Sequence, residues 1–329
     1  MELKQLGRTG TRVSELCLGC MTFGNEADEA TSQAIVDRFL DAGGNFIDTA
    51  DVYSTGLSEE ITGRAIGSRR DDVVLATKVR FSMGPGTNQV GASRRHIREG
   101  VEASLRRLGT DWIDLYQIHC WDPRTPLEET ISTLDDLVRE GKVRHVGASN
   151  YAGWHLAKAL GVAALHGWEP FVSLQPEYSL ITRDLERELL PLCREEGLAV
   201  LPWSPLAGGV LTGKYQRDVA EFPDGTRGGD TENPITFTYR LDDRAWNIVD
   251  SVRTVADATG HTPAQIALNW VMHRPGITAP IIGARTVAQL DDNLGAIGWT
   301  LEKEHRDALA WASAFRLGYP YEFIQFADH

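Results

Sequence analysis

Four titratable side chains stand at or just beyond the ends of short apolar runs in this sequence. Asp48, Lys78 and His119 each directly follow such a run, and Tyr53 lies five residues beyond Asp48. If the runs are parallel strands, their carboxyl ends open onto one face and these side chains converge there. A single Asp, Lys or His is more often structural, but four such residues at consecutive strand ends favour a functional site. Side chains of these types supply and accept protons, so the chemistry indicated is acid–base catalysis.

The elements that must position these residues alternate between strands and helices. Eight short apolar runs, bounded by Gly, Asp, Ser, Asn or Pro, are expected to be strands buried on both faces. They span residues 16–18, 46–47, 73–77, 112–118, 143–147, 172–174, 199–201 and 279–282. Strand–helix alternation favours a parallel sheet, and eight strands close a barrel, so the predicted fold is α/β, a (β/α)8 TIM barrel. An open, doubly wound sheet is the alternative on this pattern alone.

Amphipathic helices are predicted between the strands. Apolar side chains repeat with helical spacing at Ala34, Ile35, Phe39 and Leu40, at Ile97, Val101, Leu105 and Leu108, and at Leu127, Ile131, Leu134 and Val138. Gly141 is expected to end the third of these helices. Thr262 followed by Pro263 is expected to begin another helix, over residues 264–272.

Some segments fall outside this alternation. Residues 8–11 are expected to form the turn of an N-terminal β-hairpin that caps one end of the barrel. Residues 216–240 are polar and rich in Gly, Asp and Thr, which indicates a long loop, either a lid or an irregular excursion. Extra C-terminal helices and a tail at residues 317–329 complete the chain. No break in composition indicates a linker, so residues 1–329 are predicted to be one domain.

The charge balance excludes some classes of partner. The 329-residue chain has 33 Lys and Arg against 46 Asp and Glu, a net charge of −13. This surplus repels nucleic-acid phosphates and anionic lipids, so neither nucleic acid nor a membrane is expected as a partner. No apolar run approaches the roughly 18 residues that span a bilayer, and the N-terminal residues lack the apolar core of a signal peptide. Four cysteines do not make a disulfide framework, so a reduced, cytoplasmic protein is expected.

Two local motifs have competing interpretations. Residues 208–214 match the spacing of a phosphate-binding loop, but Tyr215 follows where a triphosphatase needs Ser or Thr for Mg²⁺. This loop is therefore more suited to a phosphate of another ligand. Cys17 and Cys20 have the spacing of a redox or metal pair, which His119 and Cys120 would complete only if the fold joined them. Buried packing is favoured for these cysteines, and no metal is expected.

The order of several motifs resembles the aldo-keto reductase superfamily over nearly the whole chain. The motifs are residues 46–53 (FIDTADVY) with Gly56, Ser58 and Glu59, then Thr77 and Lys78, residues 117–119 (QIH), 147–150 (GASN), 204–206 (SPL), and 283–285 (GAR) with Gln289 and Asn293. The chain is most similar to the branch that contains bacterial general reductases and potassium-channel beta subunits. In that branch a Trp replaces the Tyr that stacks on the nicotinamide.

The resemblance implies a catalytic tetrad of Asp48, Tyr53, Lys78 and His119. Reduction of a carbonyl compound requires a hydride at carbon and a proton at oxygen, and Tyr53 would donate that proton. Because a free phenol has a pKa of about 10, the neighbouring Lys78 ammonium is expected to lower it, with Asp48 holding the lysine in place. His119 would orient the substrate carbonyl toward the cofactor.

The resemblance also implies an NADP(H) site in which NADPH is preferred over NADH. The residues assigned to the cofactor are Gly19, Cys20, Met21, Asp48, Ser149, Asn150, Gln175 and Trp203 around the nicotinamide riboside, Ser204, Pro205, Leu206, Gly208 and Lys214 around the pyrophosphate, and Gly283, Arg285, Gln289 and Asn293 toward the adenosine. Trp203 would stack on the nicotinamide. Arg285 would pair with the 2′-phosphate, from which a guanidinium gains more than from a neutral ribose. Cys20 and Met21 stand where the family often has Thr and Trp.

Two other functions stay open at this point. One is a cofactor-sensing regulatory subunit with vestigial chemistry, although all four tetrad residues are present. The other is a barrel enzyme that holds a metal between Cys17, Cys20 and His119.

The sequence does not specify which small carbonyl compound is the substrate, because the loops of a barrel determine substrate specificity. The loops concerned are residues 80–91, 120–125, 216–240 and 317–329, and the aromatic side chains that could wall the pocket are Trp121, Phe237, Tyr239, Tyr319 and Tyr321. A homo-oligomer is likewise left open.

Overall fold

The computed structural model describes residues 1–217 and 241–327, which group into two compact units. The first unit comprises Met1–Pro176, Leu192–Trp203 and Gly276–Asp291, and the second comprises the described parts of Glu177–Pro191, Ser204–Pro275 and Asp292–His329. The single domain expected from the sequence stays a prediction. Most of the expected loop at 216–240, including Phe237 and Tyr239, lies outside the described residues.

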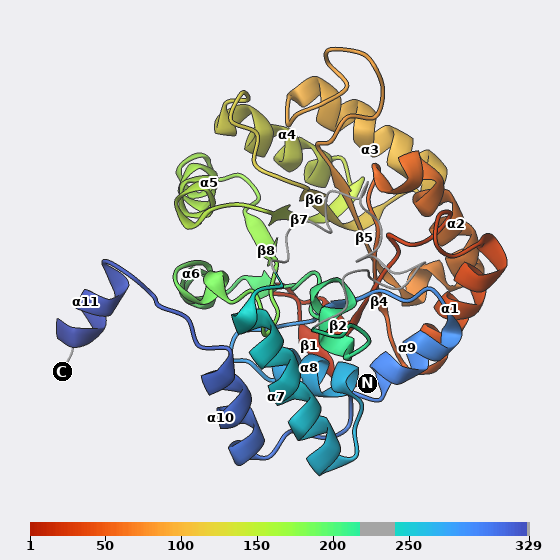
Figure 1. Ribbon diagram of the computed structural model, residues 1–329. Helices are drawn as coiled ribbons and strands as arrows, with labels where there is room; N and C mark the ends of the chain where they lie inside the picture. The colour runs from red at the N-terminus through yellow and green to blue at the C-terminus, as the bar shows by residue number, and fades with distance from the viewer. Residues whose placement is uncertain (218–240, 328–329) are drawn as a thin grey trace. The chain divides into compact units, whose positions relative to one another are not determined.

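The parallel strands all belong to the first unit and form a barrel (Figure 1). They are β3 (Cys17–Gly19), β4 (Phe46–Asp48), β5 (Val74–Val79), β6 (Ile113–Ile118), β7 (Val143–Ser149), β8 (Phe171–Gln175), β9 (Ala199–Val200) and β10 (Ile281–Ile282). Neighbouring strands are hydrogen-bonded in the order β10-β3-β4-β5-β6-β7-β8-β9. The ring closes where the Val200 carbonyl accepts from Thr278 N at 2.9 Å and the Pro202 carbonyl accepts from Ile281 N at 2.8 Å. The predicted (β/α)8 barrel is confirmed.

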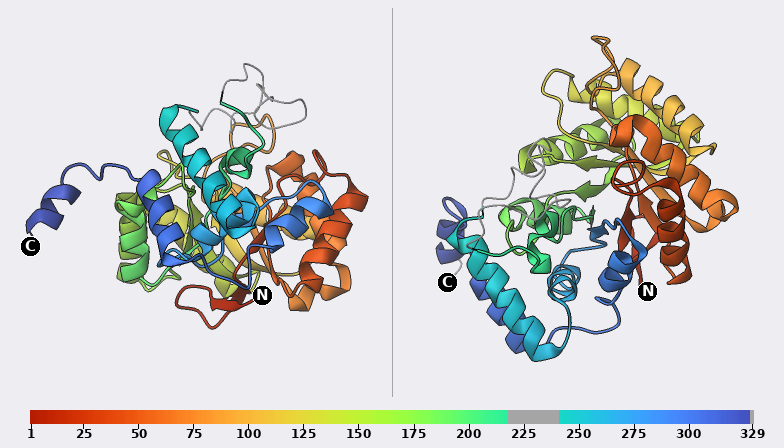
Figure 2. Two further views of the ribbon diagram at one scale, coloured as in Figure 1. Left: turned by 60° about the horizontal axis from the view of Figure 1, so that its bottom comes forward. Right: turned by 45° about the vertical axis from the view of Figure 1, so that its right-hand side comes forward.

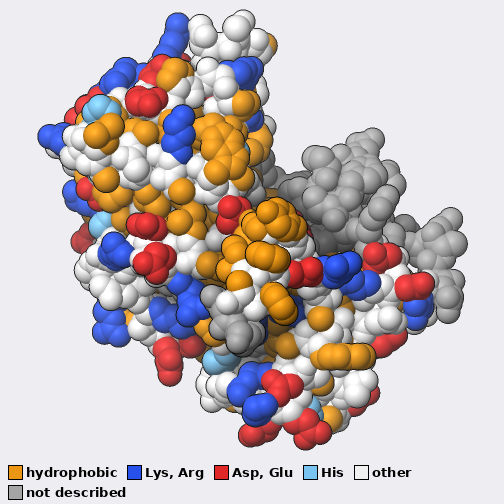
Figure 3. All heavy atoms as spheres, turned by 90° about the vertical axis from the view of Figure 1, so that its left-hand side faces the viewer, with side chains coloured by type: hydrophobic (Ala, Val, Ile, Leu, Met, Phe, Trp, Pro, Cys, Tyr) orange, Lys and Arg blue, Asp and Glu red, His pale blue; other side chains and the backbone are white. Residues whose placement is uncertain are grey.

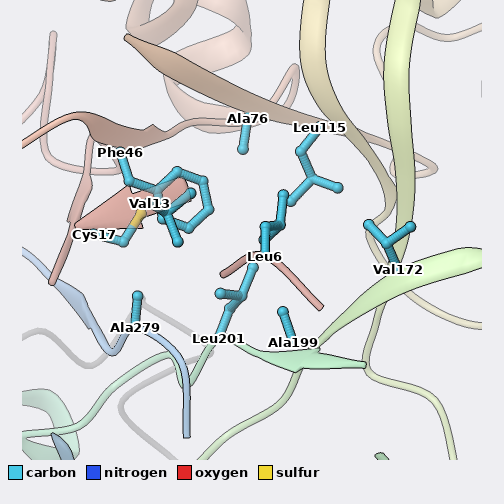
Figure 4. Packing of buried hydrophobic residues seen from close by; sticks show 10 residues of the cluster. All are labelled: Leu6, Val13, Cys17, Phe46, Ala76, Leu115, Val172, Ala199, Leu201 and Ala279. Atoms are coloured by element: carbon cyan, nitrogen blue, oxygen red, sulfur yellow. The ribbon is translucent and has the colours of Figure 1, made fainter. Parts of the chain in front are cut away.

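The N-terminal hairpin closes one end of this barrel. β1 (Leu3–Gln5) and β2 (Arg12–Ser14) pair antiparallel, and Figure 2 shows this red hairpin at one end of the strands. Leu6 and Val13 are fully buried and pack with barrel residues such as Phe46 and Leu115 (Figure 4). Several residues of this core lie at or near the first positions of their strands, so the hairpin fills the amino-terminal end of the barrel. The polar residues considered above therefore lie toward the opposite end.

Helices of the first unit surround the strands (Figure 1). They are α1 (Glu29–Asp41), α2 (Leu57–Ile66), α3 (Arg94–Leu108), α4 (Leu127–Arg139) and α5 (Gly153–His166), with short 3-10 turns η1 (Tyr53–Gly56) and η2 (Gly67–Asp72). Asp28 caps α1 by accepting from Thr31 N, and Ser93 caps α3 by accepting from His96 N. Most residues of the predicted apolar stripes are buried, but Leu40 and Val138 are only partly buried and Ala34 is exposed. Gly141 has φ 75° just after α4, as expected for a helix end.

The second unit is mainly helical. It contains η3 (Asp184–Glu186), η4 (Ala207–Thr212), α7 (Asp243–Thr259), α8 (Pro263–Met272), α10 (Lys303–Ala312) and α11 (Tyr321–Ala327), while α6 (Leu189–Glu195) and α9 (Val287–Leu294) each contain a boundary between the units. α8 begins with the expected Thr262 cap, which exchanges hydrogen bonds with Gln265. The extra C-terminal helices are thus present. Within the described residues, no helix is long and apolar enough to cross a membrane.

Large apolar side chains are exposed on several helices, among them Trp311 of α10, which is 84% exposed. On α5, Trp154 is 60% exposed and Leu165 is 79% exposed, and on α11 Phe323 and Phe326 are similarly exposed. Figure 3 shows one face of the molecule on which apolar side chains lie among charged ones. These positions do not identify a partner, so a homo-oligomer stays a prediction.

Candidate active site

Lys78 is the buried cation around which the candidate site is organised. It lies in β5, and its side chain is 0% exposed. Its Nζ donates to the Asp48 carboxylate, to the Thr49 carbonyl at 2.8 Å and to Tyr53 Oη at 3.3 Å. An ammonium group has three N–H donors, so each of them has an acceptor. Burial alone would lower the pKa of Lys78, but Asp48 and then Tyr53 hold it above its ordinary value, so the amine stays charged.

Asp48 is held at the end of β4 by more than its ion pair with Lys78. Its second oxygen accepts from Gln117 Nε2 at 3.0 Å and from Gln175 Nε2 at 2.9 Å. Gln117 is fully buried in β6 and was not expected to belong to the site. The sequence offered two signals for it: Gln117 opens the QIH motif, and it lies two residues before His119, on the same face of the strand. The carboxylate is therefore fixed from three strands at once.

Tyr53 approaches Lys78 from the loop after β4. It begins the turn η1, in which Ser54 and Thr55 have φ of 48° and 54°. Ser54 Oγ donates to the Phe23 carbonyl at 3.0 Å, which ties this turn to the loop after β3. The Tyr53 side chain is partly exposed.

The pKa of Tyr53 lies above its ordinary value. Burial is the largest cause, and Lys78 acts in the opposite direction without overcoming it. The net direction is opposite to the one expected from the lysine alone. Tyr53 therefore carries its proton at neutral pH, and its oxygen already accepts a hydrogen bond from Lys78.

His119 completes the group of four residues. It directly follows β6, is 8% exposed, and its ring meets the Tyr53 ring edge-on at a centroid distance of 5.7 Å. Burial, followed by the charges of Lys78 and Arg80, holds the pKa of His119 well below its ordinary value, so the imidazole is neutral. Its Nδ1 is buried and has no hydrogen-bond partner among the described residues. The structure thus brings Asp48, Tyr53, Lys78 and His119 together, while their catalytic roles stay predictions.

Polar residues assigned to the nicotinamide form a connected network beside His119. Asn150 Nδ2 donates to the His119 carbonyl at 2.9 Å and to Ser149 Oγ at 3.0 Å. Ser149 Oγ in turn donates to the Gln175 carbonyl at 2.8 Å. Trp203 Nε1 donates to Asn150 Oδ1 at 3.2 Å, which fixes the indole ring. Three hydrogen bonds join these four residues to one another, while the Gln175 side chain donates to Asp48 and Gln117.

Arg285 is paired with Glu26 at 2.8 Å, a contact that the sequence did not suggest. Its backbone N–H donates to Gln289 Oε1 at 2.9 Å, so those two predicted residues are adjacent. Thr22 Oγ1 donates to the carbonyl of Ala284 at 2.9 Å and joins the loop after β3 to the segment that carries Arg285.

The other residues assigned to the cofactor are divided between the two units. In the first unit, Gly19 ends β3, Cys20 is buried, Met21 is partly exposed and Gly283 directly follows β10. Ser204, Pro205, Leu206, Gly208, Lys214 and Asn293 belong to the second unit. There, Ser204, Ala207, Gly208 and Gly209 all have positive φ and form a tight turn. Their roles stay predictions.

Asp51, a second buried acid, lies between Asp48 and Tyr53 in the sequence. It is 1% exposed, and neither carboxylate oxygen has a hydrogen-bond partner among the residues described. Burial and then Glu59 raise the pKa of Asp51 to about 7. Glu59 is itself held by Thr77 Oγ1 and Arg107 Nε, each at 2.6 Å. Asp51 is therefore partly protonated at neutral pH, which its sequence position alone did not reveal.

The cysteine alternative has no support in the geometry. Cys17 and Cys20 are buried, and burial raises the pKa of the Cys20 thiol to about 12. Across residues 1–217 and 241–327, no group of three or more His, Cys, Asp or Glu side chains could hold a metal ion.

Of the aromatic side chains expected to wall a pocket, Trp121 stacks on His155 at 4.1 Å, whereas Tyr319 is 87% exposed.

Comparisons with known proteins agree with the motifs. The family model described as the aldo/keto reductase family matches residues 15–312. An uncharacterized oxidoreductase of Bacillus subtilis, YrpG, is 44% identical over 92% of this chain and 93% of its own length. A probable voltage-gated potassium channel subunit beta of Arabidopsis thaliana is 39% identical over 90% of this chain and 91% of its own. Versiconal hemiacetal acetate reductase of Aspergillus parasiticus is 36% identical over 92% of this chain and 94% of its own length.

We expect Asp51→Asn to change how stability depends on pH. Because the folded pKa of Asp51 is about 7 and its unfolded value is about 4, the folded state holds the extra proton, and the wild type loses stability as pH rises between these values. Relative to wild type, the variant should gain about 2–3 kcal/mol of unfolding free energy between pH 5 and pH 8, measured by urea titration. Asp72→Asn, at an exposed position, is the control. An equal effect of Asp51→Asn at both pH values would contradict the assignment.

Proposed function

The chain belongs to the aldo/keto reductase family, and on that premise we propose that it is an NADP(H)-dependent oxidoreductase that reduces an aldehyde or ketone to an alcohol, with Tyr53 as the proton donor. Relatives named as reductases support the reaction class. The observation that carries the proposal is the three-way hydrogen bonding of Lys78 to Asp48, Thr49 and Tyr53.

The residues present fit a nicotinamide dinucleotide. The Trp203 indole is held by its hydrogen bond to Asn150, so it offers an aromatic face at little entropic cost. The Arg285 guanidinium already pairs with an anion, the Glu26 carboxylate, which supports its use for a phosphate. Lys214, Ser204, Pro205, Leu206 and Gly208 are assigned to the pyrophosphate by resemblance.

Tyr53 donates the proton to the substrate, and Lys78 stabilises the negative charge that is left on the phenol oxygen. When bound, the cofactor supplies the hydride that the carbonyl carbon receives. Tyr53 keeps its proton at neutral pH, and because its oxygen accepts from Lys78, its own O–H is free to point at a carbonyl oxygen. As the proton leaves, negative charge develops on the phenol oxygen beside a fixed ammonium. The attraction between the Lys78 ammonium and the phenol oxygen is therefore stronger in the transition state than before proton transfer. An interaction that is stronger in the transition state accelerates the reaction.

Asp48 acts through Lys78. Its carboxylate compensates the buried ammonium and, together with the Thr49 carbonyl, leaves only one Lys78 donor for Tyr53. Without it the lysine would be an uncompensated buried charge, which proteins avoid by losing the proton. We assign Asp48 a positioning role for this reason.

His119 orients the carbonyl oxygen as a neutral donor. A neutral imidazole carries one proton, and placing it on the buried, unpartnered Nδ1 would leave a donor unsatisfied. The proton therefore belongs on Nε2, which can donate to the substrate oxygen. Burial is the largest cause that keeps this ring neutral, and it acts whatever charges lie nearby.

A preference for NADPH rests on Arg285. A guanidinium pairs more strongly with a 2′-phosphate than with a ribose hydroxyl. Glu26 must give up its contact with Arg285 when the phosphate binds, so the preference is smaller than for an unpaired arginine.

A cofactor-sensing regulatory subunit is the second candidate, because a relative is named as a probable potassium channel subunit beta. The complete and connected tetrad favours catalysis over a vestigial site.

Tyr53→Phe tests the proton donor. The variant keeps the ring but loses the proton, so turnover of aldehydes with NADPH should fall at least about 100-fold, the typical worth of a positioned acid. Binding of NADPH, followed by protein fluorescence, should change less than about threefold. Tyr151→Phe, at another buried tyrosine, is the matched control. Turnover that survives in Tyr53→Phe refutes the assignment, and NADPH binding without turnover in wild type favours the sensor.

Arg285→Gln tests the cofactor preference. Loss of a charge-assisted contact should weaken NADPH binding about 10- to 100-fold and leave NADH binding within about threefold. Dissociation constants from fluorescence titration measure both. Arg38→Gln, which breaks an exposed ion pair with Asp291, is the control. Equal losses for the two cofactors would show that Arg285 does not meet the 2′-phosphate.

A further inference from the structure

Arg80 lies next to His119 at the carboxyl end of the barrel. β5 ends at Val79 and β6 ends at Ile118, and these two residues are partners in the parallel register. The next residue of each strand is Arg80 in one case and His119 in the other. The Phe81 ring joins them, with the Arg80 guanidinium 5.3 Å from its centroid and the His119 ring 4.8 Å away. Arg80 is also close enough to lower the pKa of His119.

The described residues leave most of the Arg80 guanidinium donors without an acceptor. Of its five N–H donors, one is engaged within residues 1–217 and 241–327, from Nη2 to the Trp121 carbonyl at 3.4 Å. Its Nε is buried without a hydrogen-bond partner in the described part of the chain. Arg70, by contrast, donates to the side chains of Thr110 and Asp114 and to two carbonyl groups. Arg70 has the contacts of a structural arginine, and Arg80 does not.

The charge of Arg80 is also unbalanced. Lys78 is compensated by Asp48, but no carboxylate oxygen in the described residues lies within 4.0 Å of the Arg80 guanidinium. The acid in the neighbouring loop, Asp122, accepts from the backbone N–H groups of Ala92 and Arg124 and from Thr125 Oγ1. A positive charge is therefore left beside the neutral His119, in a protein whose net charge is −13.

The backbone at Arg80 is strained in a way that does not suit arginine. Its φ is 145°, in a region that glycine adopts freely and other residues rarely do. The Arg80 carbonyl accepts from Gly91 N at 2.8 Å, and this contact helps to hold the strained conformation. A glycine would relieve the strain, so the backbone conformation does not itself account for an arginine at this position.

We propose that Arg80 binds a carboxylate on the substrate, so that this enzyme selects carbonyl compounds that carry a negative charge a few bonds from the carbonyl group. With the carbonyl oxygen on Tyr53 and His119, the adjacent guanidinium meets the other end of a short oxo-acid. One guanidinium balances one negative charge, which matches a carboxylate better than a phosphate of charge about −1.5 to −2. The inference rests on the proposed reductase function.

Arg80→Gly separates this role from a structural one. The probes are 4-oxobutanoate and its neutral methyl ester, and kcat/KM is measured for each with NADPH. Wild type should prefer the acid, and Arg80→Gly should lose about 10- to 100-fold for the acid, mostly in KM, with less than about threefold change for the ester. Arg80→Lys should recover part of the preference because it restores the charge. Arg95→Met, which removes an exposed arginine from α3, is the control.

Binding of butanoate, an unreactive carboxylate, is measured by calorimetry on the same proteins. It should be detectable for wild type and lost in Arg80→Gly. If wild type reduces acid and ester alike, or Arg80→Gly weakens both equally, the inference is overturned while the reductase function stands. If wild type reduces neither 4-oxobutanoate nor its methyl ester, but binds butanoate and loses that binding in Arg80→Gly, the anion site stands and the reductase function fails.

Discussion

A fully buried ammonium group constrains the rest of this active site. Lys78 is stable inside the barrel only because a carboxylate and two oxygen acceptors take its three donors. Those acceptors come from β4 and the loop after it, so the barrel register must bring Lys78 beside Asp48. Gln117 and Gln175 then hold the carboxylate from two further strands. The barrel strands and the β1–β2 hairpin hold these groups in fixed positions, which a solvent-exposed lysine would not require.

Backbone strain is concentrated at the same end of the barrel. Ser54, Thr55, Arg80 and Asn150 all have positive φ although none is glycine. They lie beside the tetrad, just after strands or in the first turn of a loop. Such conformations persist when the surrounding contacts outweigh their cost, and they aim side chains that an ordinary turn would not. The packing of the strands and helices of the first unit offsets the free-energy cost of these backbone conformations.

Local patterns were sufficient for the barrel but not for the contacts of the site. The eight strands are short, apolar and sharply bounded, so each was predicted to within two residues at either end. The helical patterns predicted no range for α2, α5, α6, α7 or α9. The Ala- and Leu-rich sequence of α5 has no clear apolar stripe, and the polar first turn of α2 conceals that helix. The QIH motif includes Gln117 but does not predict its hydrogen bond to Asp48, and the pairing of Glu26 with Arg285 joins distant segments, so only the folded chain reveals these contacts. Burial reversed the direction expected for the pKa of Tyr53, and burial cannot be read from neighbours in sequence.

The central claim is that the fixed Lys78 ammonium enables Tyr53 to give up its proton. The most direct test is the single-turnover rate of aldehyde reduction at pH 7 in the paired variant Asp48→Asn/Lys78→Met, which removes both buried charges together. The account predicts that the rate falls by about 10²- to 10⁴-fold in enzyme saturated with NADPH. A paired variant that reduces aldehyde as fast as wild type would contradict it.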